Sequence, residues 1–137
     1  MTIKTLICFD YGVKRIGTAS GQAITRTATP LGIISCHHEK PDWQAIEQII
    51  KDWAPDALVV GVPNNMDGSH QDMTQKASRF IRQLEGRFKL PVYSVDERLS
   101  TFEARDRSGA TRGIDAIAAQ AILETWFAEN LDKLVTD

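Results

Sequence analysis

Apolar residues form short dense runs along the chain and recur at helical spacing between these runs. The runs Ile3–Asp10, Ala57–Val62 and Val92–Val95 are typical of strands that are covered on both faces of a sheet. Apolar residues three and four apart predict amphipathic helices after Asp42, which can cap the first of them, and over Gln71–Phe88. This order of strands and helices predicts an α/β fold with parallel strand pairs.

The segment after the first strand shows a different pattern, with short strands separated by turn residues at Gly21–Gln22 and Thr29–Pro30. It predicts an antiparallel meander of three strands: Ile16–Ser20, Thr25–Ala28 and Leu31–Cys36. The polar segment that follows, His37–Pro41, predicts a break before the first helix.

The helices are expected to bury one face each and to expose the other. The expected buried residues of the first helix are Ile46, Ile49, Ile50 and Trp53. Those of the last helix are Ile114, Ile117, Ala118, Ala121, Ile122 and Trp126. Four basic residues of the long middle helix lie largely off its apolar stripe: Lys76, Arg79, Arg82 and Arg87. A solvated helix face explains these charges at least as well as a binding surface does.

Length and composition are those of one ordinary globular domain, residues 1–137, with 42% hydrophobic and 25% charged residues. The sequence contains no run of about 18 apolar residues and no signal-peptide pattern, so we expect a cytoplasmic protein with no membrane span. A net charge of −2 does not indicate a nucleic-acid binder. It does not exclude one either, because a local basic patch is enough for binding.

Three acidic positions lie where chemistry is favoured over packing. Asp10 ends the first strand, Asp96 and Glu97 follow the last strand, and Asp115 opens the last helix beside apolar residues. The carboxyl ends of parallel strands meet at one edge of a sheet, and a helix across that edge can bring Asp115 beside the other acids. Taken singly, these acids are also explained as turn or cap residues.

A cluster of these carboxylates would need a cation, because neighbouring negative charges repel one another. Oxygen ligands suit Mg²⁺ or Mn²⁺, which can orient water for in-line attack on a phosphodiester. Spacing does not decide between Asp96 and Glu97, and we take Glu97 as the ligand and Asp96 as a support for the turn. The sequence has neither a G-x-S-x-G motif nor a Walker A motif, so it gives no support to a serine hydrolase or a P-loop enzyme.

Four groups of residues recur in a fixed order along nearly the whole chain. They are Phe9-Asp10-Tyr11-Gly12 with Arg15-Ile16-Gly17, Val59-Val60-Gly61-Val62-Pro63 with Asn65-Met66-Asp67-Gly68, Asp96-Glu97-Arg98-Leu99-Ser100-Thr101, and Ile114-Asp115 with Ala118-Ala119. Together they resemble the YqgF (RuvX) family of Holliday-junction-resolvase-like nucleases. Any one group alone would be a weak signal, whereas all four in order are specific.

The resemblance implies an RNase H-like fold, a mixed five-stranded sheet flanked by helices. It implies that Asp10, Glu97 and Asp115 are the catalytic acids and the ligands of a Mg²⁺-type ion. It also implies a bacterial cytoplasmic nuclease that matures the 5′ end of pre-16S rRNA, with structured RNA and ribosomal particles as partners. A resolvase acting on branched DNA is the alternative, and it rests on likeness of fold to the RuvC resolvases.

Other residues are expected to support this site. Basic residues that would contact phosphates are Lys14, Arg15, Arg98 and Arg112, with ordinary surface charge as the competing explanation. The expected supporting residues are Gly12 and Gly17 in the turn, Asn65 and Asp67 at the rim or in a structural turn, and Asp96. The segment between Thr101 and Asp115 is shorter than in the family but still contains Arg105, Arg107 and Arg112. The shorter segment affects the residues expected to contact the substrate more than it affects the three acids.

Two other classes of function compete with the nuclease. Asp10, Gly12 and Gly17 also resemble the phosphate-binding hairpin of actin-like ATPases and sugar kinases, but a single domain lacks the second half that would close on a nucleotide. A non-catalytic module that binds RNA or an assembling ribosomal particle would keep the acids for folding. The sequence is compatible with a monomer or a homodimer.

Overall fold

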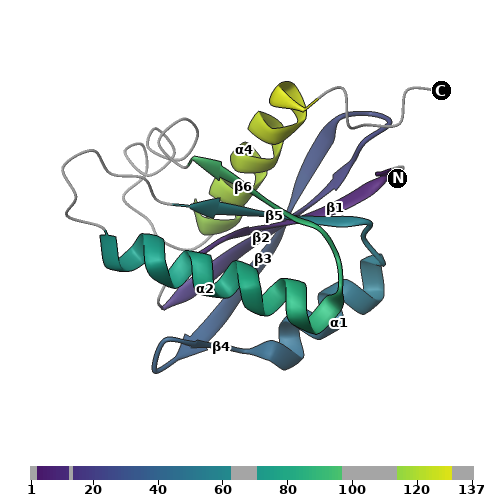
Figure 1. The fold of residues 1–137 in the computed structure, drawn as a ribbon. Coiled ribbons are helices and arrows are strands. Elements are labelled where there is room, and N and C mark those ends of the chain that lie inside the picture. The colour runs from purple at the N-terminus through teal and green to yellow at the C-terminus, as the bar shows by residue number, and fades with distance from the viewer. Residues whose placement is uncertain (1–2, 13, 63–70, 97–113, 131–137) are drawn as a thin grey trace.

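Strand β1 (Thr5–Asp10) lies inside the sheet, because nearly all of its residues are apolar and buried. The computed structural model describes residues 3–12, 14–62, 71–96 and 114–130 (Figure 1). Its six-stranded sheet has the order β4-β3-β2-β1-β5-β6. The other strands are β2 (Arg15–Gln22), β3 (Thr27–His37), β4 (Lys40–Pro41), β5 (Ala57–Val62) and β6 (Val92–Asp96). β1 pairs in parallel with β5, and β5 with β6, as the alternation of strands and helices predicted.

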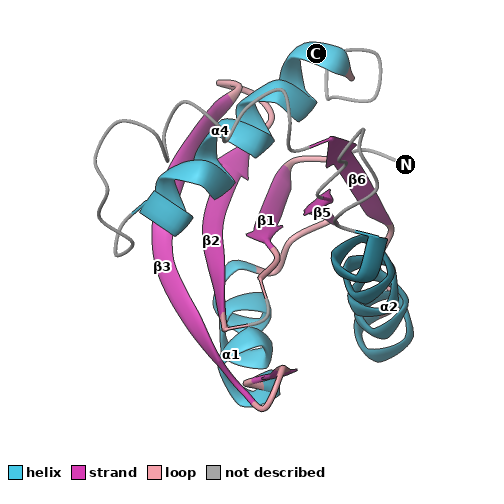
Figure 2. Ribbon diagram, turned by 90° about the vertical axis from the view of Figure 1, so that its left-hand side faces the viewer, coloured by secondary structure: helices cyan, strands magenta, loops and turns pink. Residues whose placement is uncertain are grey.

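Helices cover both faces of this sheet. They are α1 (Trp43–Trp53), α2 (Gln71–Phe88) and α4 (Ile114–Glu129). Figure 2 shows α4 on one side of the curled sheet and α1 and α2 on the other. The three helices predicted above are therefore present. Asp42 caps α1 as predicted, because its Oδ1 accepts a hydrogen bond from the Ala45 N–H at 3.3 Å.

Alternation along β1 divides the core into two clusters, since successive strand side chains point to opposite faces. The α4-side cluster includes Leu6, Cys8, Val59, Val95, Leu123 and Trp126. The α2-side cluster includes Ile7, Phe9, Tyr11, Ile46, Phe80 and Leu84. The parity of a residue in β1 therefore decides which helical layer its side chain meets.

The turn between β2 and β3 comes later than predicted. Gly21 and Gln22 belong to β2, and the chain reverses at 23–26. The Ala23 N–H donates to the Lys4 carbonyl at 2.8 Å, which keeps β2 beside β1 to its end. Glycine at position 21 suggests a turn, but in this fold it gives α4 room to approach the sheet.

Strand β3 is one strand of 11 residues, so the separate strands predicted at Thr25–Ala28 and Leu31–Cys36 are wrong. Pro30 does not end it, because the pairing with β2 shifts between Thr18 and Ala19. Such a bulge tolerates a residue that has no backbone N–H. The short β4, where a polar break was predicted, makes the sheet six-stranded rather than five-stranded.

The predicted buried faces of the helices are right in α1 and α4 except for two residues. Ile46 of α1 and Ile122 of α4 are fully buried, whereas Trp53 is 39% exposed and Ile117 is 48% exposed. In α4 apolar residues occur on nearly every side, so spacing alone could not show which of them faces the sheet. Among the helices in the described part of the chain, none is long and apolar enough to cross a membrane.

A close approach of α4 to β2 predicts that Gly21→Ala destabilises the protein. A methyl group at position 21 would lie 2.6 Å from Leu123 Cδ2 and 2.9 Å from Phe127 Cζ, and both residues are buried. We expect the free energy of unfolding in urea to fall by about 1–3 kcal/mol. The control is Gly32→Ala in β3, where the added methyl meets nothing within 4 Å. Equal stability of the two variants would contradict this account.

Candidate active site

Asp10 is a buried carboxylate at the carboxyl end of β1, with only 2% of its surface exposed. It shares strand parity with Leu6 and Cys8, so its side chain leaves the sheet on the α4 side. Aspartate is rarely buried to this degree, and a residue that only forms a turn would be solvated. Its environment therefore favours a role for the carboxylate itself.

Both cross-strand neighbours of Asp10 are glycines. Asp10 pairs with Gly17 of β2 on one side and with Gly61 of β5 on the other. Side chains of directly paired residues project from the same face about 5 Å apart. Glycine at both positions means that no cross-strand side chain lies beside the carboxylate. Gly17 lies within β2 rather than in the turn where it was predicted, and its supporting role stays a prediction. Gly61 was not among the predicted site residues, although a glycine within a dense strand is the signal of a close approach.

The row of the sheet that contains Asp10 extends to β6. Gly61 pairs with Val95, so Asp10 and Val95 lie in one transverse row two strands apart, about 10 Å. Val95 is buried in the α4-side cluster. Asp96, the last residue of β6, pairs with Val62 one position further along. The backbone of Asp96 therefore lies at the same edge of the sheet as Asp10.

Helix α4 begins on the side where β1, β5 and β6 end (Figure 1). Leu123 and Phe127, in the second half of α4, approach Gly21, which pairs with Leu6 in the first half of β1. Earlier in α4, the Gln120 Nε2 donates to the Ala28 carbonyl of β3 at 2.9 Å. Later in the helix Trp126 packs against Tyr93 of β6, so α4 crosses the sheet from β3 toward β6. Asp115 is the second residue of α4 and belongs to its first turn. The approach of the Asp115 side chain to Asp10 stays a prediction.

The turn after Asp10 is tightly held. A Cβ atom at Gly12 would lie 2.6 Å from the Arg15 carbonyl oxygen, so this turn requires glycine there. The Cys36 Sγ donates to the Gly12 carbonyl at 3.6 Å, and the Cys36 N–H donates to the Lys14 carbonyl at 2.9 Å. Strand β3 therefore supports the turn from which the exposed Lys14 and Arg15 project.

Several predicted site residues lie outside the described residues: Asn65, Asp67, Glu97, Arg98 and Arg112. The side chains of Asp96 and Asp115 lie outside them as well. Within the part of the chain that the structure describes, His, Cys, Asp and Glu form no group of three that could hold a metal. The metal ligands, and the choice between Asp96 and Glu97, stay predictions.

Burial also changes the acidity of two groups on the other face of the same edge. Desolvation raises the pKa of the Tyr11 phenol, and the nearby Cys36 raises it further, while Lys76 and Arg79 act in the opposite direction. Desolvation likewise raises the pKa of the Cys36 thiol. Both groups therefore stay protonated at neutral pH. The interaction of Tyr11 with Lys76 and Arg79 shows that basic residues of α2, for which the sequence left a solvated face and a binding surface open, lie close to the end of β1.

The chain is similar over most of its length to a nuclease family and to proteins that are named as nucleases. A model of the RuvX family, described as Holliday junction resolvase, matches residues 4–129. The chain is 48% identical over 92% of its length to a protein of Azotobacter vinelandii named "Putative pre-16S rRNA nuclease", covering 94% of that relative. A Pseudomonas fluorescens protein of the same name is 46% identical, with 99% of this chain and 100% of the relative covered.

Two solved structures share the fold. Thermus thermophilus RuvC in complex with a Holliday junction substrate superposes with a TM-score of 0.63 at 14% identity, covering 94% of this chain and 97% of RuvC. The fowlpox virus resolvase in complex with Holliday junction DNA superposes with a TM-score of 0.51 at 12% identity, covering 93% of this chain and 99% of the resolvase. The likeness to RuvC confirms the RNase H-like fold expected from the motifs.

The acidity of Tyr11 predicts how stability depends on alkaline pH. A folded-state pKa above the ordinary value of 10.0 means that the folded protein keeps a proton that the unfolded chain has lost. The stabilisation is complete below that ordinary value and is lost as pH rises through the folded-state pKa. We expect the free energy of unfolding in urea to fall over this range, and Tyr11→Phe to flatten the fall.

The control for this measurement is Tyr93→Phe, which removes the only other phenol in the chain. Tyr93 packs against the α4-side cluster, on the opposite face of the sheet from Tyr11. If both variants flatten the alkaline fall equally, or neither does, burial of Tyr11 is not its cause.

Proposed function

Because the chain belongs to the RuvX family, we propose that it is a nuclease that uses a divalent metal ion to hydrolyse phosphodiester bonds. Family membership and the named relatives support a nuclease role. The use of a metal ion and the identity of the substrate are further parts of this proposal. The observation that carries the proposal is the buried carboxylate of Asp10. It lies between Gly17 and Gly61, on the face of the sheet that α4 covers. The site consists of Asp10, Glu97 and Asp115.

The residues at this edge fit a hard divalent cation. Carboxylate oxygens are the ligands that Mg²⁺ and Mn²⁺ prefer, and a buried carboxylate whose two paired neighbours are glycines can share such an ion. We assign Glu97 rather than Asp96 because it shares strand parity with Val95, which belongs to the α4-side cluster. Asp10 would then come from the end of β1, Asp115 from α4, and Glu97 from the position directly after β6.

The protein's own residues would position the substrate. When bound, a divalent ion lowers the pKa of a coordinated water and offsets charge on the phosphate. Asp10, Glu97 and Asp115 would hold the ion and would orient a water for in-line attack on the phosphorus. Lys14 and Arg15 are exposed beside Asp10 and would hold the neighbouring phosphates, together with Arg98 and Arg112. The close packing at Gly12 keeps this turn in one conformation, which holds the cations in register with the acids.

We propose pre-16S rRNA, cut near its 5′ end, as the substrate. The support is the shared name of two relatives that are 48% and 46% identical and covered almost completely. The protein would then act in the cytoplasm on assembling ribosomal particles. Branched DNA is the second candidate, because the description of the family model is Holliday junction resolvase.

Substitution of the central carboxylate tests the nuclease. Asp10→Asn keeps the shape of the side chain but removes its charge, and we expect cleavage of labelled precursor rRNA with Mg²⁺ or Mn²⁺ to fall by about a hundredfold or more. Cleavage by the variants Glu97→Gln and Asp115→Asn should fall by a similar factor. The matched control is Asp52→Asn, an exposed carboxylate of α1, which should cleave like the wild type.

The same assay with a four-way DNA junction separates the two candidate substrates. Metal-dependent cutting of the junction but not of the RNA would overturn the rRNA assignment and leave the nuclease. If the folded wild type cuts neither substrate, the protein is a binding module and the proposed activity is wrong.

Metal binding can be measured without cleavage. We expect Mn²⁺ at about 100 times its Kd to stabilise the wild type by about 2.7 kcal/mol, because an ion that binds only the folded state adds its binding energy to folding. Asp10→Asn should lose this stabilisation in thermal unfolding, and Asp52→Asn should keep it. Equal stabilisation of all three proteins would place the ion elsewhere.

A further inference from the structure

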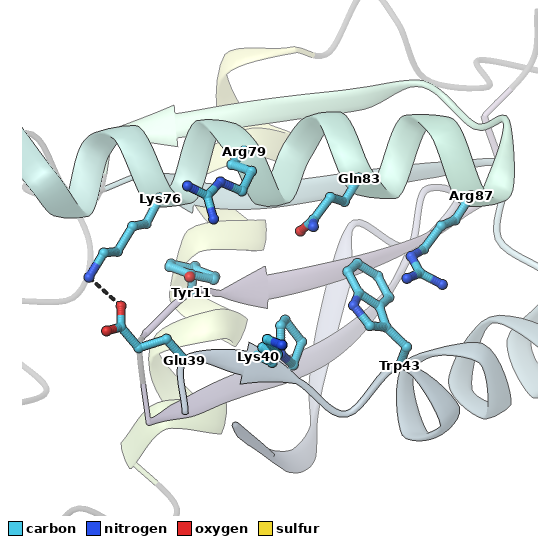
Figure 3. A pocket seen from close by; sticks show the side chains of 9 residues that line it. Tyr11, Glu39, Lys40, Trp43, Lys76, Arg79, Gln83 and Arg87 are labelled. Atoms are coloured by element: carbon cyan, nitrogen blue, oxygen red, sulfur yellow. Dashed lines mark hydrogen bonds and ion pairs between the residues drawn. The ribbon is translucent and has the colours of Figure 1, made fainter. Parts of the chain in front are cut away.

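A groove opens on the α2 side of the sheet, on the opposite face from Asp10. It lies between α2 and the segment from the end of β3 to the start of α1, and its cavity volume is about 430 Å³ (Figure 3). Tyr11 lines one end, and Trp43 lies toward the other. Residues far apart in the sequence therefore form a single concave surface that no motif predicts.

One wall of this groove is a stripe of long side chains along α2. Lys76, Arg79, Gln83 and Arg87 all line the groove. Their spacing of three, four and four residues keeps them on one face of the helix. The stripe extends over about 17 Å, at about 1.5 Å per residue. Positive charge is thus distributed along a line rather than gathered at one point.

The opposite wall is the short hairpin of β3 and β4. His37 pairs with Lys40 across a two-residue turn in which His38 and Glu39 have φ values of 51° and 64°. Positive φ at both turn residues is typical of a tight type I′ turn. The turn places Glu39 and Lys40 in the groove, where Glu39 forms an ion pair with Lys76. The hairpin thus forms a narrow wall close to α2.

Trp43 gives the far end of the groove a fixed aromatic surface. The Arg87 guanidinium lies 4.1 Å from the centroid of its ring, a cation–π contact. The ring centroids of Phe80 and Phe88 lie 5.7 Å and 6.4 Å away. These contacts hold Trp43 half-buried and keep Arg87 over it. An arginine held in this way loses little side-chain freedom when it binds an anion.

The charge of the groove is opposite to that of the whole chain. Among the described residues, its lining has the four cations Lys40, Lys76, Arg79 and Arg87 and the single acid Glu39, whereas the chain has a net charge of −2. Anions are therefore its natural ligands, and guanidinium groups match phosphate oxygens in particular. The linear arrangement favours an extended polyanion over a compact mononucleotide.

Tyr11 connects this groove with the candidate active site. It follows Asp10 directly in the chain, and alternation sends its side chain to the α2 side. A strand whose phosphate lies at Asp10 could therefore pass around the edge of the sheet at Tyr11 and continue along the basic stripe of α2 toward Arg87.

We propose that this groove binds the sugar–phosphate backbone of a single nucleic-acid strand that continues from the Asp10 edge. The choice of a nucleic acid as the polyanion rests on the proposed function. The groove would give the nuclease a second surface that contacts its substrate. The strand would bind without regard to sequence, because cations that contact phosphates do not distinguish bases.

Binding without cleavage tests the groove. The probe is a fluorescein-labelled oligouridylate of about 12 nucleotides, which suits a groove that tracks a backbone, followed by anisotropy in EDTA. The groove variant is the double substitution Arg79→Gln/Arg87→Gln. The matched control is Arg82→Gln/Lys51→Gln, which removes the same charge from exposed positions of α2 and α1 outside the groove lining.

We expect the groove variant to bind roughly tenfold more weakly than the control at low salt. The slope of log K against log salt should also fall by about 0.7 for each cation removed from the groove. Arg79→Gln alone, which leaves Arg87 on Trp43, should give about half of the change in slope. Urea unfolding of each variant checks that the fold is intact.

The outcomes separate this inference from the proposed function. Equal affinities and salt slopes for the groove variant and the control overturn the groove as a strand site, even if Asp10→Asn abolishes cleavage. A groove-dependent affinity for the strand supports it, even if the wild type cuts nothing. Binding of uridine monophosphate as tightly as of the oligomer, lost in the same variant, overturns the extended strand in favour of a small nucleotide.

Discussion

The burial of β1 on both faces is the constraint on which the rest of the structure depends. Leu6 and Cys8 need α4, while Ile7 and Phe9 need α1 and α2, so the chain must supply a helical layer on each side of the sheet. The same strand needs β2 and β5 to satisfy its backbone hydrogen bonds. Once these requirements are met, the end of β1 lies at an edge that is framed by both layers.

At that edge, successive side chains of the chain point to opposite faces of the sheet and meet different neighbours. Asp10 and Tyr11 are adjacent, yet one side chain enters the α4 side and the other the α2 side. On the first side the paired neighbours are Gly17 and Gly61, so no cross-strand side chain lies beside the carboxylate. On the second side the neighbours are basic residues of α2. The proposed acidic site and the proposed strand groove would therefore contact one substrate from the two faces of one strand end.

Small residues are placed where two parts of the chain approach each other closely. Gly21 admits Leu123 and Phe127 of α4, and Gly12 admits the backbone at Arg15. The first approach sets where α4 lies on the sheet, and with it the side on which Asp115 is found. The second fixes the turn that presents Lys14 and Arg15. Each glycine thus acts on the site through the position of a neighbouring element.

The sequence by itself determined the α/β class, the three helices and the parallel strands, because apolar spacing reflects burial directly. The motifs also indicated the family and predicted Asp10 as one of its catalytic acids. Only the tertiary structure decided that Gly61 lies beside Asp10, that β3 continues through Pro30, and that Lys40 faces the stripe on α2. These features depend on strand register and on contacts between distant segments. Local spacing cannot encode them, since a solvated face and the wall of a groove show the same helical pattern.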